Sequence, residues 1–466
     1  MANPPLTISE TQKGLKAKEF SARQLVDSYL AKIEQRNPEL NAFLTVSRNE
    51  AYSQAEKTDN LLAGGGDVFE KYPLLGCCVS HKDLFLTKGI RTTAGSKVLE
   101  NYIPAYSSTV VERLEKAGAI TLGKTNCDAW AHGASGENSD FGPSKNPWNT
   151  KYVPGGSSSG SAAAVAANLT LFATGTDTGG SIRQPASFCG VYGFKPTYGA
   201  VSRFGIIAMA SSLDSIGHFA RKTADIKKIF EVTKGQDNKD STVKNGPYLK
   251  TPAKLRIGIP KEYFVKGLSE NVEQAVRGAA KVFENEGVEI VEISLPHTKY
   301  AISVYYIVQP AEVSSNLGRY DGIRYGNDRA SFGDEAKRRI MLGTYVLSAG
   351  YYEAYYLKAM KVRSKIIADF DLAWEKVDTI LAPVSPTPSF LLGEKTSDPL
   401  QMYLADIFTV AGNLAGIPGL SVPCGFTKEG LPLGFQLLGP RFSENTLFEL
   451  SALYERATSY SPKEAK

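Results

Sequence analysis

Two turns rich in glycine and serine bracket an alanine-rich segment between residues 155 and 181, and this stretch most constrains the fold. It reads GGSSSGSAAAVAANLTLFATGTDTGGS. Because alanine is the best helix former and adds no bulk, residues 161–168 predict a closely packed helix. The apolar run at residues 169–174 predicts a buried strand that returns to the second turn. The stretch therefore presents two serines, Ser157 and Ser181, each in a turn where glycine lets another group approach the backbone closely.

Three simple interpretations of this stretch are two surface loops, a phosphate-binding loop and a nucleophile elbow. Two ordinary surface loops would account for the glycines and serines alone. A phosphate-binding loop is excluded because Ser161 stands where that loop requires lysine. Residues 156–160 match the G-x-S-x-G nucleophile elbow in form, but the elbow follows a strand, and residues 149–154 are polar and end in proline. The elbow also needs a later histidine, for which the chain offers His218 and His297, and we disfavour it.

A longer pattern resembles the signature of the amidase signature family. The sequence Asp-Thr-Gly-Gly-Ser-Ile-Arg occupies residues 177–183, and Gly-Gly-Ser-Ser occupies residues 155–158. The resemblance implies an α/β fold in which a large mixed β-sheet is covered by helices on both faces. We expect a single domain over residues 1–466, made of an N-terminal helical layer at 1–65, a catalytic core at 74–235, and the remainder of the sheet with the substrate-pocket helices at 255–466.

The same resemblance implies a Ser-Ser-Lys set that hydrolyses amides. Ser181 would be the nucleophile, Ser157 the relay serine and Lys82 the base, with Lys82 followed by an aspartate as in the family. The spacings suit the family, since Lys82 lies 75 positions before Ser157 and Ser181 lies 24 positions after it. Backbone N–H groups in the second turn would stabilise the oxyanion of the tetrahedral intermediate. These groups are expected around Thr178, Gly179 and Gly180.

A lysine can serve as a base only when its amine is neutral. A free lysine has a pKa of about 10.4, so the site must lower the pKa of Lys82 strongly, and only burial has an effect of that size. The apolar residues 74–81 directly precede Lys82 and would supply the burial. We therefore expect the Lys82 nitrogen to lie away from water and in contact with the Ser157 oxygen. The resemblance also implies a cis peptide bond between Gly156 and Ser157.

Within the family, the chain resembles the A subunits of the tRNA-dependent glutamyl and aspartyl amidotransferases over nearly its whole length. In those subunits the amide is the side chain of glutamine, and ammonia passes to a partner that converts Glu-tRNA(Gln) to Gln-tRNA(Gln). The residues that carry the likeness lie at 92–97, 99–102, 141–143, 145–148, 195–199, 314–317, 337–345 and 414–419.

Free glutamine carries a carboxylate and an ammonium, so its pocket needs one cation and one anion. By the resemblance, Arg339 would hold the α-carboxylate through its bidentate fork, Asp406 the α-ammonium, and Tyr305 would make a supporting contact. Taken alone, Arg339 could be a charge on a helix surface and Asp406 an ordinary helix carboxylate. The segment between residues 326 and 337 is shorter than is usual in these subunits, which bears on how the pocket closes.

The resemblance also implies the partners. These are the B and C subunits of a heterotrimer, with Glu-tRNA(Gln) held mainly through the B subunit. No cofactor is expected in this chain, because ATP and Mg²⁺ belong to the partner. A free-standing amidase that acts on aryl or aliphatic amides is the alternative, although such an enzyme has no use for the charged pair of Arg339 and Asp406. A non-catalytic scaffold in a tRNA complex is a third possibility.

Composition argues against several other classes of protein. The net charge of +5 is mild for 466 residues and argues against a direct nucleic-acid binder. Five cysteines without a CxxC pair and four histidines without ligand spacing argue against a metal site and for a reducing compartment. No apolar run approaches the roughly 20 residues of a membrane span. The first ten residues resemble neither a signal peptide nor a transit peptide, so we expect a cytoplasmic protein.

Helical and strand patterns alternate along the rest of the chain. Ser21 and Gln24 form a capping box before a helical spacing of apolar residues at 25–33. The loop at residues 124–149 is polar and long, so we predict that it forms a wall of the site. Further predictions are helices at 108–118, 269–286 and 337–371; strands at 74–81, 119–123, 255–260, 288–295, 377–382, 420–423 and 433–438; a strand and turn at 202–217; and a linker at 236–252.

Overall fold

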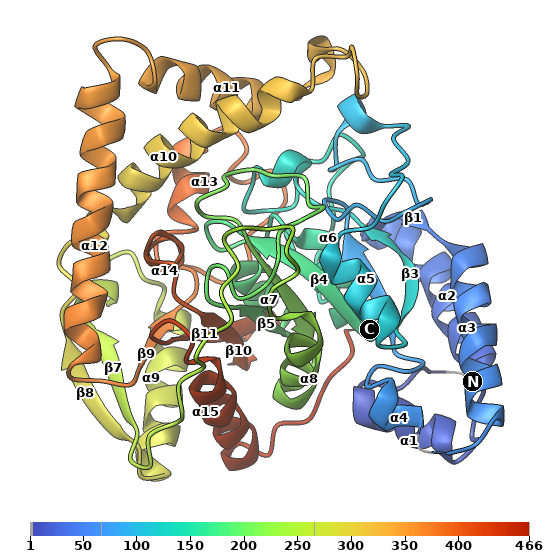
Figure 1. Ribbon diagram of the computed structural model, residues 1–466. Helices are drawn as coiled ribbons and strands as arrows, with labels where there is room; N and C mark the ends of the chain where they lie inside the picture. The colour runs from blue at the N-terminus through green and yellow to red at the C-terminus, as the bar shows by residue number, and fades with distance from the viewer. Residues whose placement is uncertain (1–2, 67, 265, 466) are drawn as a thin grey trace.

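The computed structural model describes residues 3–66, 68–264 and 266–465, so Met1, Ala2, Asp67, Val265 and Lys466 of the expected domain lie outside the described residues. Within the described residues, eleven strands form one mixed sheet (Figure 1). The strands are β1 (Phe43–Val46), β2 (Cys78–Lys82), β3 (Ile120–Thr125), β4 (Phe172–Asp177), β5 (Tyr192–Lys195), β6 (Ser215–Ala220), β7 (Arg256–Pro260), β8 (Glu289–Ile293), β9 (Thr379–Pro383), β10 (Gly419–Phe426) and β11 (Pro432–Leu438). Their order across the sheet is β1-β3-β2-β4-β6-β5-β10-β11-β9-β7-β8.

Helices surround this sheet. They are α1 (Ile8–Lys16), α2 (Ala22–Leu40), α3 (Arg48–Ala63), α4 (Val68–Lys71), α5 (Thr109–Lys116), α6 (Ser159–Ala166), α7 (Arg183–Cys189), α8 (Thr223–Thr233), α9 (Glu270–Asn285), α10 (Ala301–Asn316), α11 (Asp334–Val346), α12 (Lys358–Trp374), α13 (Pro399–Leu404), α14 (Val410–Ala415) and α15 (Glu444–Ala457). The expected α/β class with a large mixed sheet is confirmed.

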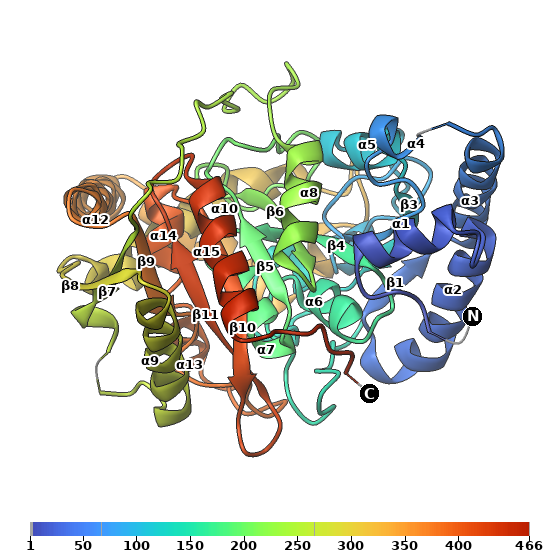
Figure 2. The ribbon, with the colours of Figure 1, turned by 90° about the horizontal axis from the view of Figure 1, so that it is seen from below.

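A different hydrophobic core packs against each face of the sheet. Successive residues of a strand point to opposite faces. In β9, Leu381 packs into the core that includes α8, α9 and α15, whereas Ile380 and Ala382 pack into the core that includes α10, α12 and α14. Figure 2 shows α8, α9 and α15 together in front of the sheet. Helices therefore cover both faces, as the family resemblance implies.

Parallel pairing places the ends of two strands at one edge. β2 pairs in parallel with both β3 and β4, so Lys82 at the end of β2 and Asp177 at the end of β4 lie at the same edge of the sheet. The helix α6 precedes β4 and the helix α7 follows it, and both helices are buried along their whole length. The Gly/Ser-rich turns at the starts of these helices therefore meet where β2 and β4 end.

Some predicted boundaries are wrong. The strand expected at residues 169–174 is β4, which begins three residues later because the Leu169 N–H still donates to the Ala164 carbonyl in the turn after α6. The strand expected at 74–81 is β2, which begins only at Cys78. The segment at 202–217 is irregular until β6 begins.

Other predictions agree with the structure. Ser21 caps α2 in a complete capping box with Gln24, although the helix continues past Pro38 to a left-handed residue at Asn41. The expected unit at residues 255–295 is β7-α9-β8, with β7 and β8 parallel. The region at 337–371 is helical but interrupted, because a turn and the π-helical segment Tyr352–Leu357 separate α11 from α12.

Candidate active site

Lys82 is fully buried and contacts three hydroxyl oxygens. Its Nζ lies 2.8 Å from Ser157 Oγ, 2.9 Å from Ser158 Oγ and 2.8 Å from Thr176 Oγ1. Because Lys82 is the last residue of β2, its side chain extends from the sheet edge to the turn that begins α6. The contact with Ser157 that the sequence predicts is therefore present.

Burial lowers the pKa of Lys82 to about 8, while Cys127 and Asp128 act in the opposite direction. A neutral amine has two N–H donors and one lone pair. Ser158 Oγ already donates to the Thr176 carbonyl at 3.2 Å, so it can only accept from the amine. When the second N–H donates to Thr176 Oγ1, the lone pair of a neutral Lys82 is left to accept the proton of Ser157, which is the direction of transfer that a base requires.

The two candidate serines lie in neighbouring turns. Ser157 is fully buried, and the peptide bond between Gly156 and Ser157 is cis. Ser181 keeps 7% of its surface exposed, so it is the serine of the set that is accessible from outside. The Ser158 N–H donates to the Ser181 carbonyl at 3.2 Å, which ties the turns together. Among the described residues, no hydrogen bond joins the Ser157 and Ser181 hydroxyls directly.

The turn before Ser181 has no room for side chains. A Cβ at Gly179 would lie 2.8 Å from Cζ of Tyr305, and a Cβ at Gly180 would lie 2.3 Å from Oγ1 of Thr409. Gly180 also has φ of +141°, which other residues rarely adopt. The Gly179 carbonyl is held from the other side, since Thr409 Oγ1 donates to it at 2.6 Å. The turn before Ser181 is therefore tightly packed on both sides.

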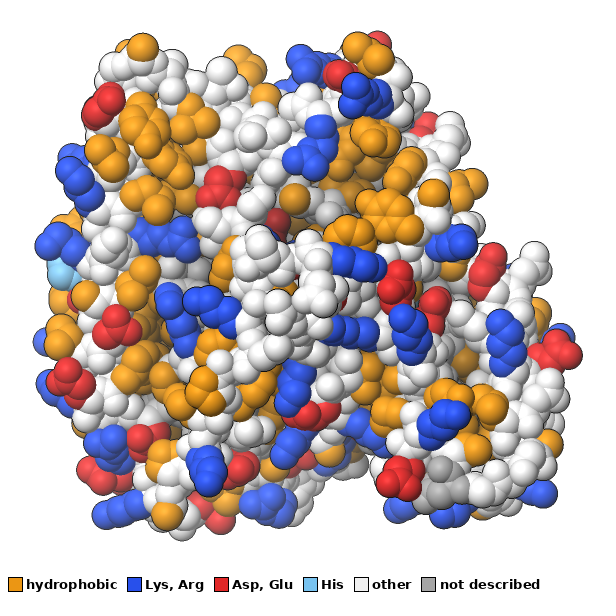
Figure 3. Space-filling model, in the orientation of Figure 1, with side chains coloured by type: hydrophobic (Ala, Val, Ile, Leu, Met, Phe, Trp, Pro, Cys, Tyr) orange, Lys and Arg blue, Asp and Glu red, His pale blue; other side chains and the backbone are white. Residues whose placement is uncertain are grey.

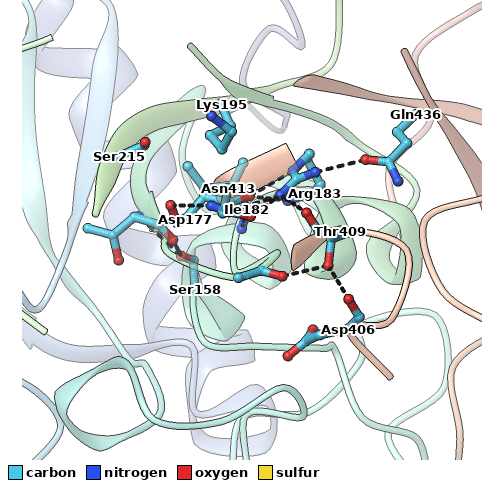
Figure 4. A network of polar contacts seen from close by, with 12 residues as sticks. Ser158, Asp177, Ile182, Arg183, Lys195, Ser215, Asp406, Thr409, Asn413 and Gln436 are labelled. Carbon is cyan, nitrogen blue, oxygen red and sulfur yellow. Dashed lines mark hydrogen bonds and ion pairs between the residues drawn. The ribbon is translucent and has the colours of Figure 1, made fainter. Parts of the chain in front are cut away.

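A buried ion pair also holds the turn that carries Ser181 (Figure 4). Arg183 Nε lies 3.1 Å from Asp177 Oδ2, and both side chains are fully buried. Burial alone would raise the pKa of Asp177, but Arg183 lowers it to about 2. Arg183 also donates to Gln436 Oε1 at 2.8 Å and to Asn413 Oδ1 at 2.6 Å. The turn that carries Ser181 is thereby anchored to β11 and α14.

Arg339 lines a cavity of about 270 Å³. Its Nε donates to Glu335 Oε1 at 2.8 Å, its Nη1 donates to Gln309 Oε1 at 2.8 Å, and its guanidinium lies 5.1 Å from the ring centre of Tyr306. Burial alone would lower the pKa of Arg339, but Tyr306 and Glu335 raise it above the ordinary value, so the guanidinium is charged. Tyr403 also lines this cavity.

The loop predicted as a site wall lines the same cavity. Loop residues from His132 to Asn138 contribute to its lining, so the loop forms one wall of this cavity. The cavity thus lies between the loop and α11, which carries Arg339.

Asp406 and Tyr305 lie beside the glycine turn. A Cβ at Gly180 would meet Asp406 Oδ1 at 3.3 Å, and Tyr305 packs on Gly179. Asp406 Oδ1 is buried, and no described residue forms a hydrogen bond with it. Burial raises the pKa of Asp406 well above its ordinary value, Asp177 adds to the effect, and Arg339 opposes it. A cationic ligand would supply the missing partner and favour the charged carboxylate.

Several polar groups of the site were not predicted from the sequence. Ser158 and Thr176 hold the lysine nitrogen, and Asp128 and Gln184 lie beneath the Ser157 turn. The chain contains many serines and threonines, so nothing local marks these two as lysine partners. No group of three or more His, Cys, Asp or Glu in the described residues is arranged to hold a metal ion.

Comparison with known proteins gives the family. The Amidase family model matches residues 24–448. The A subunit of glutamyl-tRNA(Gln) amidotransferase from Carboxydothermus hydrogenoformans is 52% identical, with 98% of each chain covered. The protein of the same name from Geobacter metallireducens is 49% identical, with 99% of each chain covered. The crystal structure of the Thermotoga maritima protein of this name shares 40% identity and a TM-score of 0.83, covering 99% of this chain and 98% of its own.

The chain belongs to the amidase signature family of enzymes. Within this family it is similar, over almost its whole length, to proteins named as amidotransferase A subunits.

Proposed function

We propose that this chain is the glutaminase subunit of a tRNA-dependent amidotransferase. The proposal depends above all on the buried contact between Lys82 Nζ and Ser157 Oγ at 2.8 Å. The similarity to amidotransferase A subunits supports the choice of glutamine as the amide. Asp406 supports it independently, because a neutral amide would leave its buried Oδ1 without a partner, and the charged Arg339 beside the cavity suits a substrate that carries a carboxylate.

Hydrolysis would proceed through an acyl-enzyme. Neutral Lys82 accepts the proton of Ser157 as Ser157 accepts that of Ser181, whose oxygen attacks the side-chain amide carbon of glutamine. Backbone N–H groups of Thr178, Gly179 and Gly180 stabilise the tetrahedral oxyanion. The proton returns through Ser157 to the leaving nitrogen, which departs as ammonia. Water then hydrolyses the γ-glutamyl ester of Ser181, and glutamate is released.

The cavity side of the site would bind the rest of glutamine. Arg339 would hold the α-carboxylate, because Glu335 and Gln309 fix its guanidinium and its charge is maintained. The unpartnered oxygen of Asp406 would accept the α-ammonium. Tyr305 would support the substrate where it packs on the glycine turn.

Ammonia would pass to partner subunits. In the proposed heterotrimer, the B subunit uses ATP and Mg²⁺ to amidate Glu-tRNA(Gln), and a C subunit completes the assembly in the cytoplasm. Exposed apolar side chains such as Met341, Tyr345 and Tyr351 gather where α11 ends and α12 begins (Figure 3). Apolar patches of this kind mark interaction surfaces, which supports a chain that works in a complex. The described residues include no helix with the length and apolarity to cross a membrane.

A test uses Ser181→Ala in the complex reconstituted with B and C subunits. Glutamine-dependent formation of Gln-tRNA(Gln) should fall by at least about 10⁴-fold, because the nucleophile is lost. Ammonia-dependent formation should stay within about twofold of the unmodified complex, because only the nitrogen source changes. Lys337→Gln, at an exposed position of α11, should change neither reaction.

Three results would contradict the proposal. Loss of both reactions would show that Ser181 does not act in glutamine hydrolysis alone. Rapid hydrolysis of simple aryl or aliphatic amides without partners would favour the free-standing amidase. Unchanged rates in every assay would favour a non-catalytic scaffold.

A further inference from the structure

Two buried side chains outside the Ser-Ser-Lys set connect the turn that carries Ser157 with the loop that lines the cavity. They are Asp128, at the start of that loop, and Gln184, in α7. Both side chains are fully buried.

The carboxylate of Asp128 lies between the loop and the turn. Its Oδ1 accepts the Asn138 N–H at 2.8 Å, and its Oδ2 accepts the Gly136 N–H at 3.1 Å. The Asp128 backbone N–H donates to the Ser157 carbonyl at 3.1 Å. A Cβ at Gly156 would lie only 2.0 Å from Asp128 Oδ2, so the turn packs directly on this carboxylate.

Gln184 makes a second connection between the same two segments. Its Oε1 accepts the Gly156 N–H at 2.9 Å, and its Nε2 donates to the Ala134 carbonyl at 2.7 Å. Gln184 lies three residues after Ser181, and its own N–H donates to the Gly180 carbonyl at 2.9 Å. Gln184 thus connects the loop that lines the cavity and the turn that carries Ser157 with α7, the helix that follows Ser181.

We propose that Asp128 and Gln184 act together as positioning residues that hold Ser157 in place between Lys82 and Ser181. This inference rests on the function proposed above. A proton relay requires hydrogen-bond distances on both sides of Ser157, and a displacement of about 1 Å can cost about 100-fold in rate. The contacts of Arg339 and Asp406 with the charges of glutamine do not involve this turn. Loss of either positioning residue should therefore lower kcat much more than it raises KM.

The test measures glutaminase kcat and KM of Asp128→Asn and Gln184→Ala in the complex with its partner subunits. Each should lower kcat by about 10- to 100-fold and change KM by less than about threefold. Asp225→Asn is a matched control, because Asp225 is also buried and accepts a backbone N–H, from Ile8 in α1, where no site residue lies. Its kcat should stay within about twofold of the unmodified enzyme.

A double variant separates positioning from general destabilisation. If both side chains hold one turn, Asp128→Asn with Gln184→Ala should be little slower than the worse single variant. Rate losses that multiply, or a loss no larger than that of Asp225→Asn, would overturn the inference. Gln184→Glu keeps the size and the acceptor for Gly156 but removes the donor to Ala134, and it should lower kcat in the same way should Gln184→Ala fail to fold.

Amide hydrogen exchange tests the same inference without relying on catalysis. Asp128→Asn should speed exchange at Gly136, Asn138 and the Ser157 turn, whereas Asp225→Asn should not. An unmodified complex without glutaminase activity would contradict the proposed function. Unchanged exchange at the turn would contradict the positioning role, whatever the activity.

Discussion

Each of the three hydrogen-bond partners of Lys82 Nζ is a hydroxyl oxygen. Hydroxyls can donate or accept, so this environment can accommodate the amine in either protonation state. Carboxylates in direct contact would instead favour the ammonium and raise the pKa. The nearest acidic groups act on Lys82 only through space, and burial remains the dominant effect.

The pH dependence of the reaction should report this amine. Because the pKa of Lys82 is lowered to about 8, the fraction of neutral lysine rises tenfold per pH unit below that value and levels off above it. The kcat/KM for glutamine should therefore rise through pH 6 to 8 and then reach a plateau, as measured by ammonia release at constant ionic strength. A flat or falling profile over that range would contradict a lysine base.

The resemblance to the amidase signature family points to Lys82, Ser157 and Ser181, because each lies in a motif of several residues. It could not select Ser158 or Thr176. These two residues meet the lysine only because β2 and β4 end side by side, which is a property of sheet pairing and not of local sequence. Asp128 and Gln184 could not be predicted for the same reason.

At the scale of elements, α11 presents Arg339 to the cavity while its neighbours fix the guanidinium. Glu335 lies one turn earlier in the same helix, and Tyr306 and Gln309 belong to α10. These contacts leave the fork little freedom, so little conformational entropy remains to be lost when a carboxylate binds.

Arg339→Lys should raise the KM for glutamine by about 10-fold or more with a smaller effect on kcat, because a lysine keeps the charge but loses the bidentate fork. Initial rates over a range of glutamine concentrations provide the measurement. Arg277→Lys, on the exposed face of α9, serves as the control and should leave both constants unchanged. A fall in kcat at constant KM would place Arg339 in the chemical step instead.

Element types were predicted better than element boundaries. The β7-α9-β8 unit matches its pattern closely because its helix has one apolar and one charged face, and its short strands carry isoleucine or valine residues beside charged ones. The strand β1 was not predicted, because it has only four residues and lies between the two long helices α2 and α3. Its position is decided by pairing with β3, which lies far along the chain.

At the scale of the whole molecule, one sheet runs through all parts of the described chain, and the cores on its two faces share its strands. The single domain expected from the sequence stays a prediction, and cooperative unfolding tests it. Trp130 packs on Tyr320, Trp148 on Phe426 and Trp374 on Phe370, so the three tryptophans report on different regions.

Thermal or urea unfolding followed by tryptophan fluorescence and by far-ultraviolet circular dichroism should give one coincident transition, because no part of the sheet can separate without exposing a shared core. The midpoints from the two signals should agree within error. Two separated transitions would contradict a single domain and would indicate that the part beyond residue 255 unfolds independently.

The groups that would break the amide bond all come from residues 82–181, whereas the three side chains proposed to bind the charged end of the substrate come from residues 305–406. The catalytic groups and these substrate-binding side chains are thus encoded in separate stretches of the gene. Variation in the later stretch can change which amide enters without altering how it is cut. A chain built in this way can acquire new substrates by small steps, because each intermediate keeps a working hydrolytic apparatus.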